Sequence, residues 1–410
     1  MPFLTSPEYT SISYQTLGLN KEQAQGLQGF LRDKELPNAL EFGLNEICTT
    51  SFVGVIKYGE LQLNIVPKII GNLQEESSTS CLKNLIFMLR YIKKLNIRNI
   101  DEAELGKTNN PFLEVLIAHY TNTLLAALHR HIPHNYETYE ENLNTLKGKI
   151  VFTQHLKNNV TNQAQIYCRF DEFTANNLLN QVLKYVAFAL SKITQVSGTY
   201  NKLKRILAIY EDVSLRNIRY EESKEVILNR NQIAFNEPLK LAQMFLEHSA
   251  ISFHEHTFTN LAILFDMDLL FEEFVANVLV EKFGSENVKP QEPREIITKN
   301  NEFPVSYNIK PDILFKKEII IDTKYKILDL PEKKPSSADI YQMLAYAHFY
   351  PGYRHIILCY PKYKQEYSLN LPLKNTADYR ISLLTVDLSQ PLEENLTAIY
   401  EGFERVLENV

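Results

Sequence analysis

Apolar side chains along this chain follow the spacing of strands in some stretches and the spacing of helices in others. From Phe52 to Ile69 they alternate on either side of Tyr58-Gly59-Glu60, which predicts a β-hairpin. Further on, apolar residues recur at helical spacing. This pattern predicts helices over Cys81–Leu95, Pro111–Ile132, Asn176–Ile193 and Leu203–Tyr210, with strands near Leu146–Phe152.

The last third of the chain combines both patterns. Helical spacing predicts helices over Asp266–Phe283, Asp339–Ala347 and Glu393–Leu407. Between the first two helices, the segments Tyr307–Phe315 and Ile319–Tyr325 are rich in β-branched and aromatic residues. The polar residues Lys316-Lys317-Glu318 lie between them as a plausible turn, so the two segments are predicted to form a hairpin.

These elements predict a mixed α+β fold in three regions. Residues 1–75 form a β-rich N-terminal region, and the acidic, Ser-rich stretch Gln74–Ser80 reads as a connector. Residues 76–234 form a mostly helical middle region with a short β insertion. Residues 235–410 form the third region, which contains the Tyr307–Tyr325 hairpin and ends in a helix.

That hairpin carries the candidate chemistry. If Lys316-Lys317-Glu318 is the loop, Asp312 lies opposite Asp322, and Asp322 and Lys324 project from one face while Thr323 points the other way. Two adjacent carboxylates repel, and a divalent cation between them keeps both ionised. Mg²⁺ fits oxygen ligands and can activate a water that attacks phosphorus, with Lys324 orienting that water or neutralising the phosphate. The alternative is an exposed hairpin that merely carries charged residues.

Two helices extend the pattern. Gln342 and Tyr346 are four residues apart and therefore lie on one helix face. The upstream helix carries Glu272 and Glu273 beside its apolar stripe, and the sequence does not decide which of them faces the hairpin.

In the order helix Glu, Pro311-Asp312, Asp322-Thr323-Lys324 and Gln342-x3-Tyr346, these motifs resemble the PD-(D/E)xK nuclease superfamily, in particular its RecB-like QxxxY branch. The resemblance implies a nuclease domain over 235–410, in which a mixed β-sheet is flanked by helices. It implies Asp312 and Asp322 as metal ligands and Lys324 as the catalytic lysine. It also implies the Thr323 carbonyl as a main-chain ligand and Glu272, or its rival Glu273, as an outer one. Gln342 and Tyr346 complete the implied site.

A longer series of segments is similar to the McrC family, the nuclease subunits of McrBC modification-dependent restriction systems. These segments are Phe52–Ile69, Tyr139–Ile150, Cys168–Lys184, Leu270-Phe271-Glu272, the nuclease motifs and Leu358-Cys359-Tyr360-Pro361. The resemblance implies a DNA endonuclease that uses Mg²⁺, for which Mn²⁺ can substitute. It implies docking on a hexameric AAA+ GTPase, McrB, whose GTP hydrolysis the chain stimulates, and cleavage of double-stranded, modified DNA. The N-terminal and middle regions are then the expected docking surface.

Two other function classes remain open on the sequence. One is a stand-alone RecB-like repair nuclease that needs no motor. The other is a noncatalytic regulator that only activates a GTPase, against which the intact set of Asp312, Asp322 and Lys324 argues.

The composition of the chain excludes several classes of function. A net charge of −6 argues against nonspecific coating of nucleic acid, although Lys289–Lys334 holds ten Lys/Arg against eight Asp/Glu, a local balance of +2. Four separated cysteines without a CxxC pair indicate neither a disulfide framework nor a zinc site. No phosphate-binding glycine loop is present, so we expect no bound nucleotide. With no signal-like start and no unbroken apolar run, we expect a cytoplasmic protein and no membrane partner.

Histidines form two further clusters. His129, His131 and His134 lie close together in sequence, and His254 and His256 are two residues apart on a possible strand. No cysteine and no HExxH motif accompanies them, so we interpret them as structural and leave them out of the predicted metal site.

Overall fold

The computed structural model describes residues 3–68, 85, 87–89, 111–160, 164–252, 257–299, 305–371, 373–374, 379–388 and 392–408. The chain forms two compact units, and each is described by itself. The first unit joins Met1–Phe112 to Ala262–Val410, and the second is Leu113–Leu261. Within the described ranges, no helix is both long enough and apolar enough to span a membrane.

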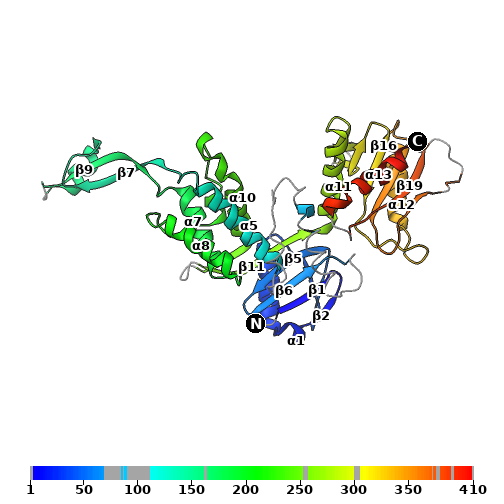
Figure 1. The fold of residues 1–410 in the computed structure, drawn as a ribbon, viewed down its shortest axis with the longest axis horizontal. Helices are drawn as coiled ribbons and strands as arrows, with labels where there is room; N and C mark the ends of the chain where they lie inside the picture. The colour runs from blue at the N-terminus through cyan, green and yellow to red at the C-terminus, as the bar shows by residue number, and fades with distance from the viewer. Residues whose placement is uncertain are drawn as a thin grey trace. The chain divides into compact units, whose positions relative to one another are not determined.

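A five-stranded sheet is built around the predicted hairpin (Figure 1). The strand order is β1-β6-β5-β11-β10, with β1 at Phe3–Pro7, β5 at Phe52–Tyr58, β6 at Leu61–Val66, β10 at Ser249–Ser252 and β11 at Thr257–Asp266. The antiparallel β5–β6 hairpin turns at Gly59, which confirms the prediction for Phe52–Ile69 over its described part. Gly54 of β5 has φ 137°, and a Cβ there would lie 2.1 Å from the carbonyl oxygen of Ile263 in β11. Glycine is therefore required for this approach of the two strands.

A smaller sheet and two helices complete the first fifty residues, in which no individual strand or helix was predicted. The sheet has the order β2-β4-β3, with β2 at Ser11–Ser13, β3 at Leu40–Phe42 and β4 at Glu46–Thr49. Helix α1 spans Tyr14–Leu17 and α2 spans Lys21–Asp33. Asn20 and Gln23 form a reciprocal capping box at the start of α2, which satisfies backbone donors there.

The part of the first unit that contains the Ile313–Thr323 hairpin is a six-stranded mixed sheet. Its order is β12-β15-β16-β17-β19-β18, with β12 at Val288–Pro290, β15 at Ile313–Phe315, β16 at Ile319–Thr323, β17 at His355–Pro361, β18 at Ser368–Asn370 and β19 at Arg380–Val386. The β16, β17 and β19 strands are parallel and almost entirely buried, as expected for strands covered on both faces.

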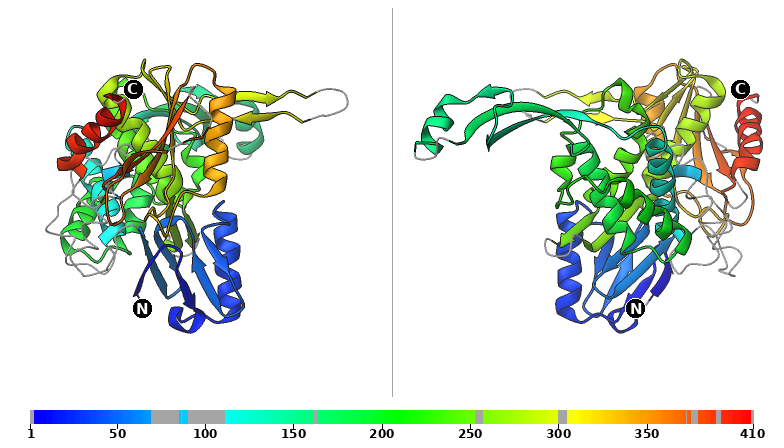
Figure 2. Two further views of the ribbon diagram at one scale, coloured as in Figure 1. Left: turned by 90° about the vertical axis from the view of Figure 1, so that its right-hand side faces the viewer. Right: turned by 60° about the vertical axis from the view of Figure 1, so that its left-hand side comes forward.

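Three helices flank this sheet (Figures 1 and 2). They are α11 at Met267–Phe283, α12 at Ser337–Phe349 and α13 at Leu392–Glu408, so the helices predicted from Asp266, Asp339 and Glu393 are confirmed to within a few residues. Met343 and Tyr346 of α12 pack in one core with Ile320 of β16. Helix α11 contacts β16, α13 contacts β19, and the two helices contact each other. The mixed α/β fold class is confirmed.

The strand predicted over Tyr307–Phe315 is interrupted. Its first part, β14 at Tyr307–Ile309, pairs with β13 at Arg294–Ile297 in a separate ribbon (Figure 2, left). Only Ile313–Phe315 joins the main sheet as β15. Pro311 lies at the break, where the missing N–H prevents a continuous ladder. The prediction of one uninterrupted strand was therefore wrong.

The second unit is mostly helical. Its helices are α5 at Pro111–Leu128, which begins at the end of the first unit, α7 at Leu178–Ser191, α8 at Ser197–Ile209, α9 at Tyr220–Ser223, the 3₁₀ turn η1 at Arg230–Phe235 and α10 at Asn236–Glu247. The helices predicted from Pro111, Asn176 and Leu203 are confirmed, although α8 begins earlier. Most of the helix predicted over Cys81–Leu95 lies outside the described residues. The boundaries of the three predicted regions stay a prediction.

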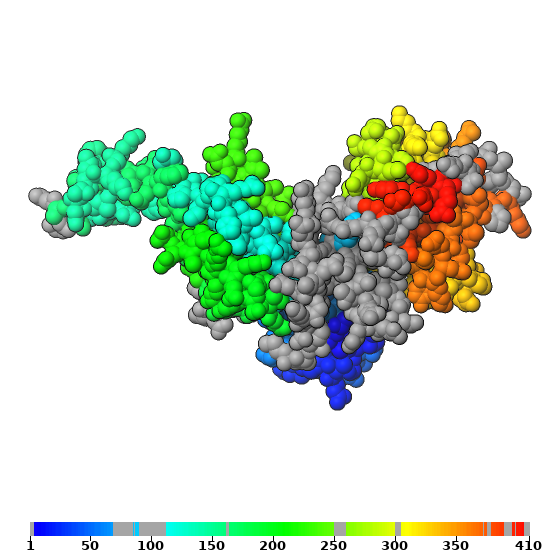
Figure 3. All heavy atoms as spheres, viewed as in Figure 1, coloured from blue at the N-terminus to red at the C-terminus, as the bar shows by residue number. Residues whose placement is uncertain are grey.

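A three-stranded arm projects from the helices of the second unit (Figures 1 and 3). Strand β7 (Asn135–Leu143) pairs antiparallel with β9 (Ile166–Thr174) over its whole length. On the other edge of β9, β8 (Lys149–Ile150) pairs with Arg169 and Cys168, and helix α6 (Phe152–Asn158) follows β8 in the chain. The sequence predicted strands only near Leu146–Phe152. The longer β7 was missed because its alternating residues are half-exposed or exposed, so no apolar periodicity marks them.

Candidate active site

The β15–β16 hairpin sets the spacing of the candidate site. Its turn is Lys316-Lys317-Glu318, with left-handed φ values of 48° at Lys316 and 59° at Lys317. The Glu318 N–H donates to the Phe315 carbonyl at 3.2 Å. Because Ile313 pairs with Ile321, continuing the same register places Asp312 opposite Asp322. The predicted loop and register are confirmed.

Asp322 lies near the carboxyl end of β16, and its side chain has no exposed surface. It shares a strand face with Ile320, the face that packs against α12. One carboxylate oxygen, Oδ1, accepts a hydrogen bond from the Tyr346 hydroxyl at 3.1 Å, and the other forms an ion pair with Lys324 Nζ. Burial, with the charge of Asp312 adding to it, raises the pKa of Asp322 to about 6. A group that titrates near neutrality at a buried position is well suited to hold a cation or a proton.

Asp312 follows the break at Pro311 and is held by Thr323. Its Oδ2 accepts hydrogen bonds from the backbone N–H and from the hydroxyl of Thr323, both at 2.7 Å. Strand alternation placed Thr323 on the face opposite to that of Asp322 and Lys324, and it did not predict these two bonds. Asp312 lies outside the ladder, so its carboxylate can reach across to the other face of β16. These two bonds leave Oδ1 of Asp312 as the oxygen available to a ligand.

Lys324 lies just beyond the last residue of β16. Its Nζ forms the ion pair with Asp322, and its backbone N–H donates to the Cys359 carbonyl at 2.8 Å. Burial alone would lower the pKa of Lys324, but the charge and hydrogen bond of Asp322 outweigh it, so the pKa lies above its usual value. The lysine is therefore a fixed positive charge at the carboxylate pair, as the sequence predicted.

Gln342 and Tyr346 on α12 contact Asp322 through the Tyr346 hydroxyl. Gln342 Nε2 donates to the Tyr346 hydroxyl oxygen at 2.7 Å. The single Tyr346 hydroxyl proton faces two acceptors, Asp322 Oδ1 at 3.1 Å and the Lys310 carbonyl at 3.0 Å. Burial first, and then the Asp322 charge, raises the pKa of Tyr346 well above its usual value, so it stays a donor. Both residues join the site through Asp322.

Glu272 of α11 reaches the same neighbourhood. Burial and then the charge of Asp312 raise its pKa, which shows that the two carboxylates are within electrostatic reach. Gln291 connects it to the hairpin, because its Nε2 donates to Glu272 Oε1 at 2.6 Å and its Oε1 accepts from Lys310 Nζ at 2.8 Å. Glu273 has only a minor effect on Glu272. Of the two rivals, Glu272 is the one for which the structure gives a link to Asp312.

Sequence reasoning missed Gln291 and Lys310. Besides its two side-chain bonds, Gln291 has φ 55° and donates its backbone N–H to the Asp312 carbonyl at 2.9 Å. A non-glycine residue held at positive φ beside a candidate site indicates a local constraint. Nothing in the local sequence Lys289-Pro290-Gln291 could have revealed this, since the partners come from three separate segments.

The donor set at the hairpin consists of hard oxygen ligands. Across the described ranges, no group of three or more His, Cys, Asp and Glu side chains is close enough to hold a metal ion. A cation here would therefore depend on two carboxylates, Asp312 and Asp322, with main-chain oxygen and water completing its shell. This set fits Mg²⁺, which keeps several waters and takes one or two carboxylates.

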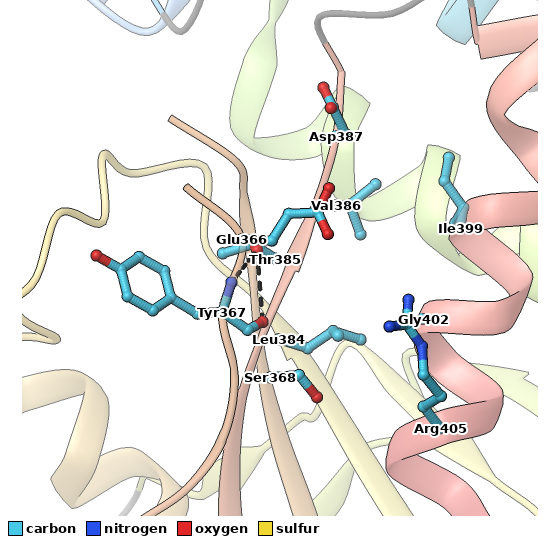
Figure 4. Close-up of a pocket in the computed structure, with 10 residues that line it drawn as sticks. All are labelled: Glu366, Tyr367, Ser368, Leu384, Thr385, Val386, Asp387, Ile399, Gly402 and Arg405. Carbon is cyan, nitrogen blue, oxygen red and sulfur yellow. Dashed lines mark hydrogen bonds between the residues drawn. The ribbon is translucent and has the colours of Figure 1, made fainter. Parts of the chain in front are cut away.

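Other candidate features lie away from these residues. A cavity of about 260 Å³ lies between the β18–β19 pair and α13 (Figure 4). Glu366, Asp387 and Arg405 supply its charged lining, and no candidate site residue contributes to it. Of the histidines set aside, His254 and His256 lie outside the described residues, whereas the His134 ring stacks on Phe173 of the arm.

Comparison with known proteins identifies the family. The family model described as "McrBC 5-methylcytosine restriction system component" matches residues 47–361. No sequence among curated proteins matches this chain.

Two solved structures from Thermococcus gammatolerans are similar in fold. A half-complex of McrB AAA+ hexamers with bound McrC contains a chain with 18% identity and a TM-score of 0.68, over 97% of this chain and 99% of that one. A chain of the McrBC complex has 18% identity and a TM-score of 0.51, over 68% of this chain and 87% of that one. Since the family model covers most of its length, this chain belongs to the McrBC 5-methylcytosine restriction system component family.

Proposed function

We propose that this chain is the nuclease subunit of an McrBC-type restriction system, and that it hydrolyses phosphodiester bonds of double-stranded, modified DNA. The observation that carries the proposal is the convergence of Asp312, Asp322 and Lys324 at the carboxyl end of β16. Two carboxylates and an ammonium at one point match what metal-assisted phosphodiester hydrolysis requires.

Asp312 and Asp322 would hold Mg²⁺, with the Thr323 carbonyl as a main-chain ligand and Glu272 in the outer shell. When bound, the cation polarises the phosphoryl group and lowers the pKa of the attacking water. The raised pKa of Asp322, about 6, supports this assignment, because the buried carboxylate lacks enough compensating charge of its own.

The remaining residues orient the two carboxylates and neutralise charge on the phosphate. Lys324 places a positive charge where negative charge develops on the phosphate, an effect that acts on the transition state. Tyr346, held by Gln342, donates to Asp322 and fixes the orientation of its carboxylate. Asp312 is fixed in turn by its two bonds from Thr323. The pair is thus oriented before any substrate arrives.

The partner class follows from the family and from the solved structure of McrB AAA+ hexamers with bound McrC. We propose that this chain docks on an McrB-like hexamer and stimulates its GTP hydrolysis. The arm of the second unit is the proposed docking element, because it carries unburied apolar side chains at its far end. Phe152, Leu156 and Val160 are 70%, 68% and 73% exposed and follow one another at helical spacing, and such a group of exposed apolar side chains is typical of a protein interaction site.

A plasmid-cleavage assay tests the proposal. Cleavage of methylated plasmid should require this chain, an McrB-like protein, GTP and Mg²⁺ together. Cutting of DNA ends without the motor would favour the stand-alone repair nuclease instead. GTPase stimulation without any cleavage, under conditions that support the family's activity, would favour the noncatalytic regulator.

A further inference from the structure

A buried ionic cluster in the first unit joins the N-terminal sheet to the residue after Lys324. Glu8 directly follows β1, and its side chain is wholly buried. Its Oε1 accepts hydrogen bonds from the Lys68 backbone N–H at 3.0 Å and from the Tyr325 hydroxyl at 3.1 Å. Its Oε2 lies 3.7 Å from Lys68 Nζ. One carboxylate therefore connects the ends of β1 and β6 to Tyr325, more than 250 residues away in sequence.

Lys68 holds the same tyrosine at a second point. Its Nζ donates to the Tyr325 carbonyl at 3.3 Å and lies 4.9 Å from the centroid of the Tyr325 ring. The Tyr9 ring flanks it on another side at 4.0 Å. Tyr325 is thus bound through both its hydroxyl and its backbone, and its ring lies 6.0 Å from that of Phe271 in α11.

Tyr325 directly follows Lys324, so the contacts of Tyr325 restrain the chain next to the lysine. Strand β16 ends at Thr323, so Lys324 and Tyr325 lie beyond the paired part of the strand. The Lys324 backbone has one bond to β17, from its N–H to the Cys359 carbonyl, and its own carbonyl accepts from Lys326 at 2.8 Å. The next fixed point along the chain is Tyr325, held by Glu8 and Lys68.

The energetics favour a geometric role for the pair. Burial raises the pKa of Glu8 to about 7 even though Lys68 opposes the shift, and Asp268 adds a second negative charge nearby. A buried ion pair of this kind is weak support for stability, since apolar residues of similar volume would often serve as well. Its hydrogen bonds are directional, however, and they specify where Tyr325 can lie.

We propose that Glu8 and Lys68 are positioning residues for Lys324, acting by holding Tyr325 and thereby transmitting the position of the N-terminal sheet to the catalytic lysine. The inference rests on the proposed function for the role of Lys324, but the constraint on the backbone does not. Glu8 and Lys68 are far from Lys324 in sequence, yet they help to hold it in place. Support of this kind around a reacting group fixes its geometry.

The test combines hydrogen exchange with single-turnover cleavage in the complex with the McrB-like partner. Tyr325→Phe removes the bond to Glu8 and keeps the ring. Glu8→Ala removes both acceptors, whereas Glu8→Gln keeps an oxygen that can accept both bonds. Tyr120→Phe is the matched control, because it deletes a buried hydroxyl that bonds the Leu183 carbonyl in the second unit.

Amide exchange over Lys324–Lys326 should accelerate by about tenfold in Tyr325→Phe and more in Glu8→Ala, roughly the loss of one or two hydrogen bonds. Cleavage should slow by about tenfold, with the half-saturating Mg²⁺ concentration and DNA affinity unchanged. Glu8→Gln should recover part of both effects, and Tyr120→Phe should show neither.

Wild-type exchange over Lys324–Lys326 in both Tyr325→Phe and Glu8→Ala would overturn the inference. So would slower cleavage that Tyr120→Phe reproduces, since the effect would then be general. The exchange measurement needs no cleavage. If the wild-type complex fails to cut DNA, the proposed function fails while the exchange data still decide this inference.

Discussion

Replacing Asp322 with asparagine should change how the stability of the metal-free protein depends on pH. The pKa of this buried carboxyl rises from 3.8 to about 6 on folding. Because the folded pKa lies above the unfolded one, the native state binds the proton more tightly. The resulting stabilisation is full below pH 3.8 and is lost as pH rises through about 6. The shift of about two units corresponds to ~3 kcal/mol over the whole window and to ~1.4 kcal/mol between about pH 5 and 7.5.

Denaturant unfolding with a chelator present, at several pH values across that range, measures this effect. Other buried groups also titrate: burial raises the pKa of Glu8 to about 7, with the same sign, and lowers that of His355 to about 4, with the opposite sign. These terms cancel when the variant is compared with wild type at each pH. Relative to wild type, Asp322→Asn should gain ~1.4 kcal/mol between about pH 5 and 7.5. If the unfolding free energies of the variant and of wild type depended on pH in the same way, the raised pKa of Asp322 would be refuted.

Three further predictions concern catalysis and docking. Lys324→Ala should slow cleavage by about 10²-fold or more with Mg²⁺ binding retained, and Lys324→Arg should rescue poorly; parallel loss of Mg²⁺ affinity by calorimetry would point to a structural role. Tyr346→Phe removes a hydrogen bond that lowers the Asp322 pKa, so the acid limb of the pH–rate profile should move to higher pH; an unmoved limb would exclude that role. Phe152→Asp with Leu156→Asp should abolish GTPase stimulation, while Ile227→Asp, at an 88% exposed site of the same unit, should not; equal stimulation by all three proteins would remove the arm from the docking surface.

Much of the site could be predicted because its geometry is local. Asp312 and Asp322 lie on the two sides of one short turn, so strand alternation and loop length fix their separation. Gln342 and Tyr346 are one helical turn apart, and their hydrogen bond follows from that spacing. Periodicity of two or 3.6 residues is enough to place such groups.

The missed features depend on long-range contacts. Gln291 forms side-chain hydrogen bonds with Glu272 and Lys310, each of which lies in another segment. Glu8 forms one with Tyr325, which is more than 300 residues away in sequence. No spacing rule links these positions. The bonds from Thr323 to Asp312 were missed for a related reason: the strand rule places side chains only inside the ladder, and Asp312 lies just outside it.

The elements of the fold likewise divide into those marked by local periodicity and those that depend on long-range pairing. The β5–β6 hairpin and helices α11, α12 and α13 follow apolar periodicity and were predicted. The arm strand β7 is stabilised by pairing with β9 and buries neither face fully, so its sequence NYETYEENL carries no apolar alternation to detect.

Cleavage and GTP hydrolysis measured on one Asp322→Ala preparation test the central claim most directly. Mixed with the McrB-like partner, GTP, Mg²⁺ and methylated plasmid, the variant should stimulate GTP hydrolysis as wild type does and leave the plasmid intact, and Asp312→Ala should behave alike. Removal of one carboxylate empties the proposed metal site but leaves the arm untouched. Cleavage by either variant at a rate near that of wild type would contradict the assignment of Asp312 and Asp322 as the catalytic carboxylates.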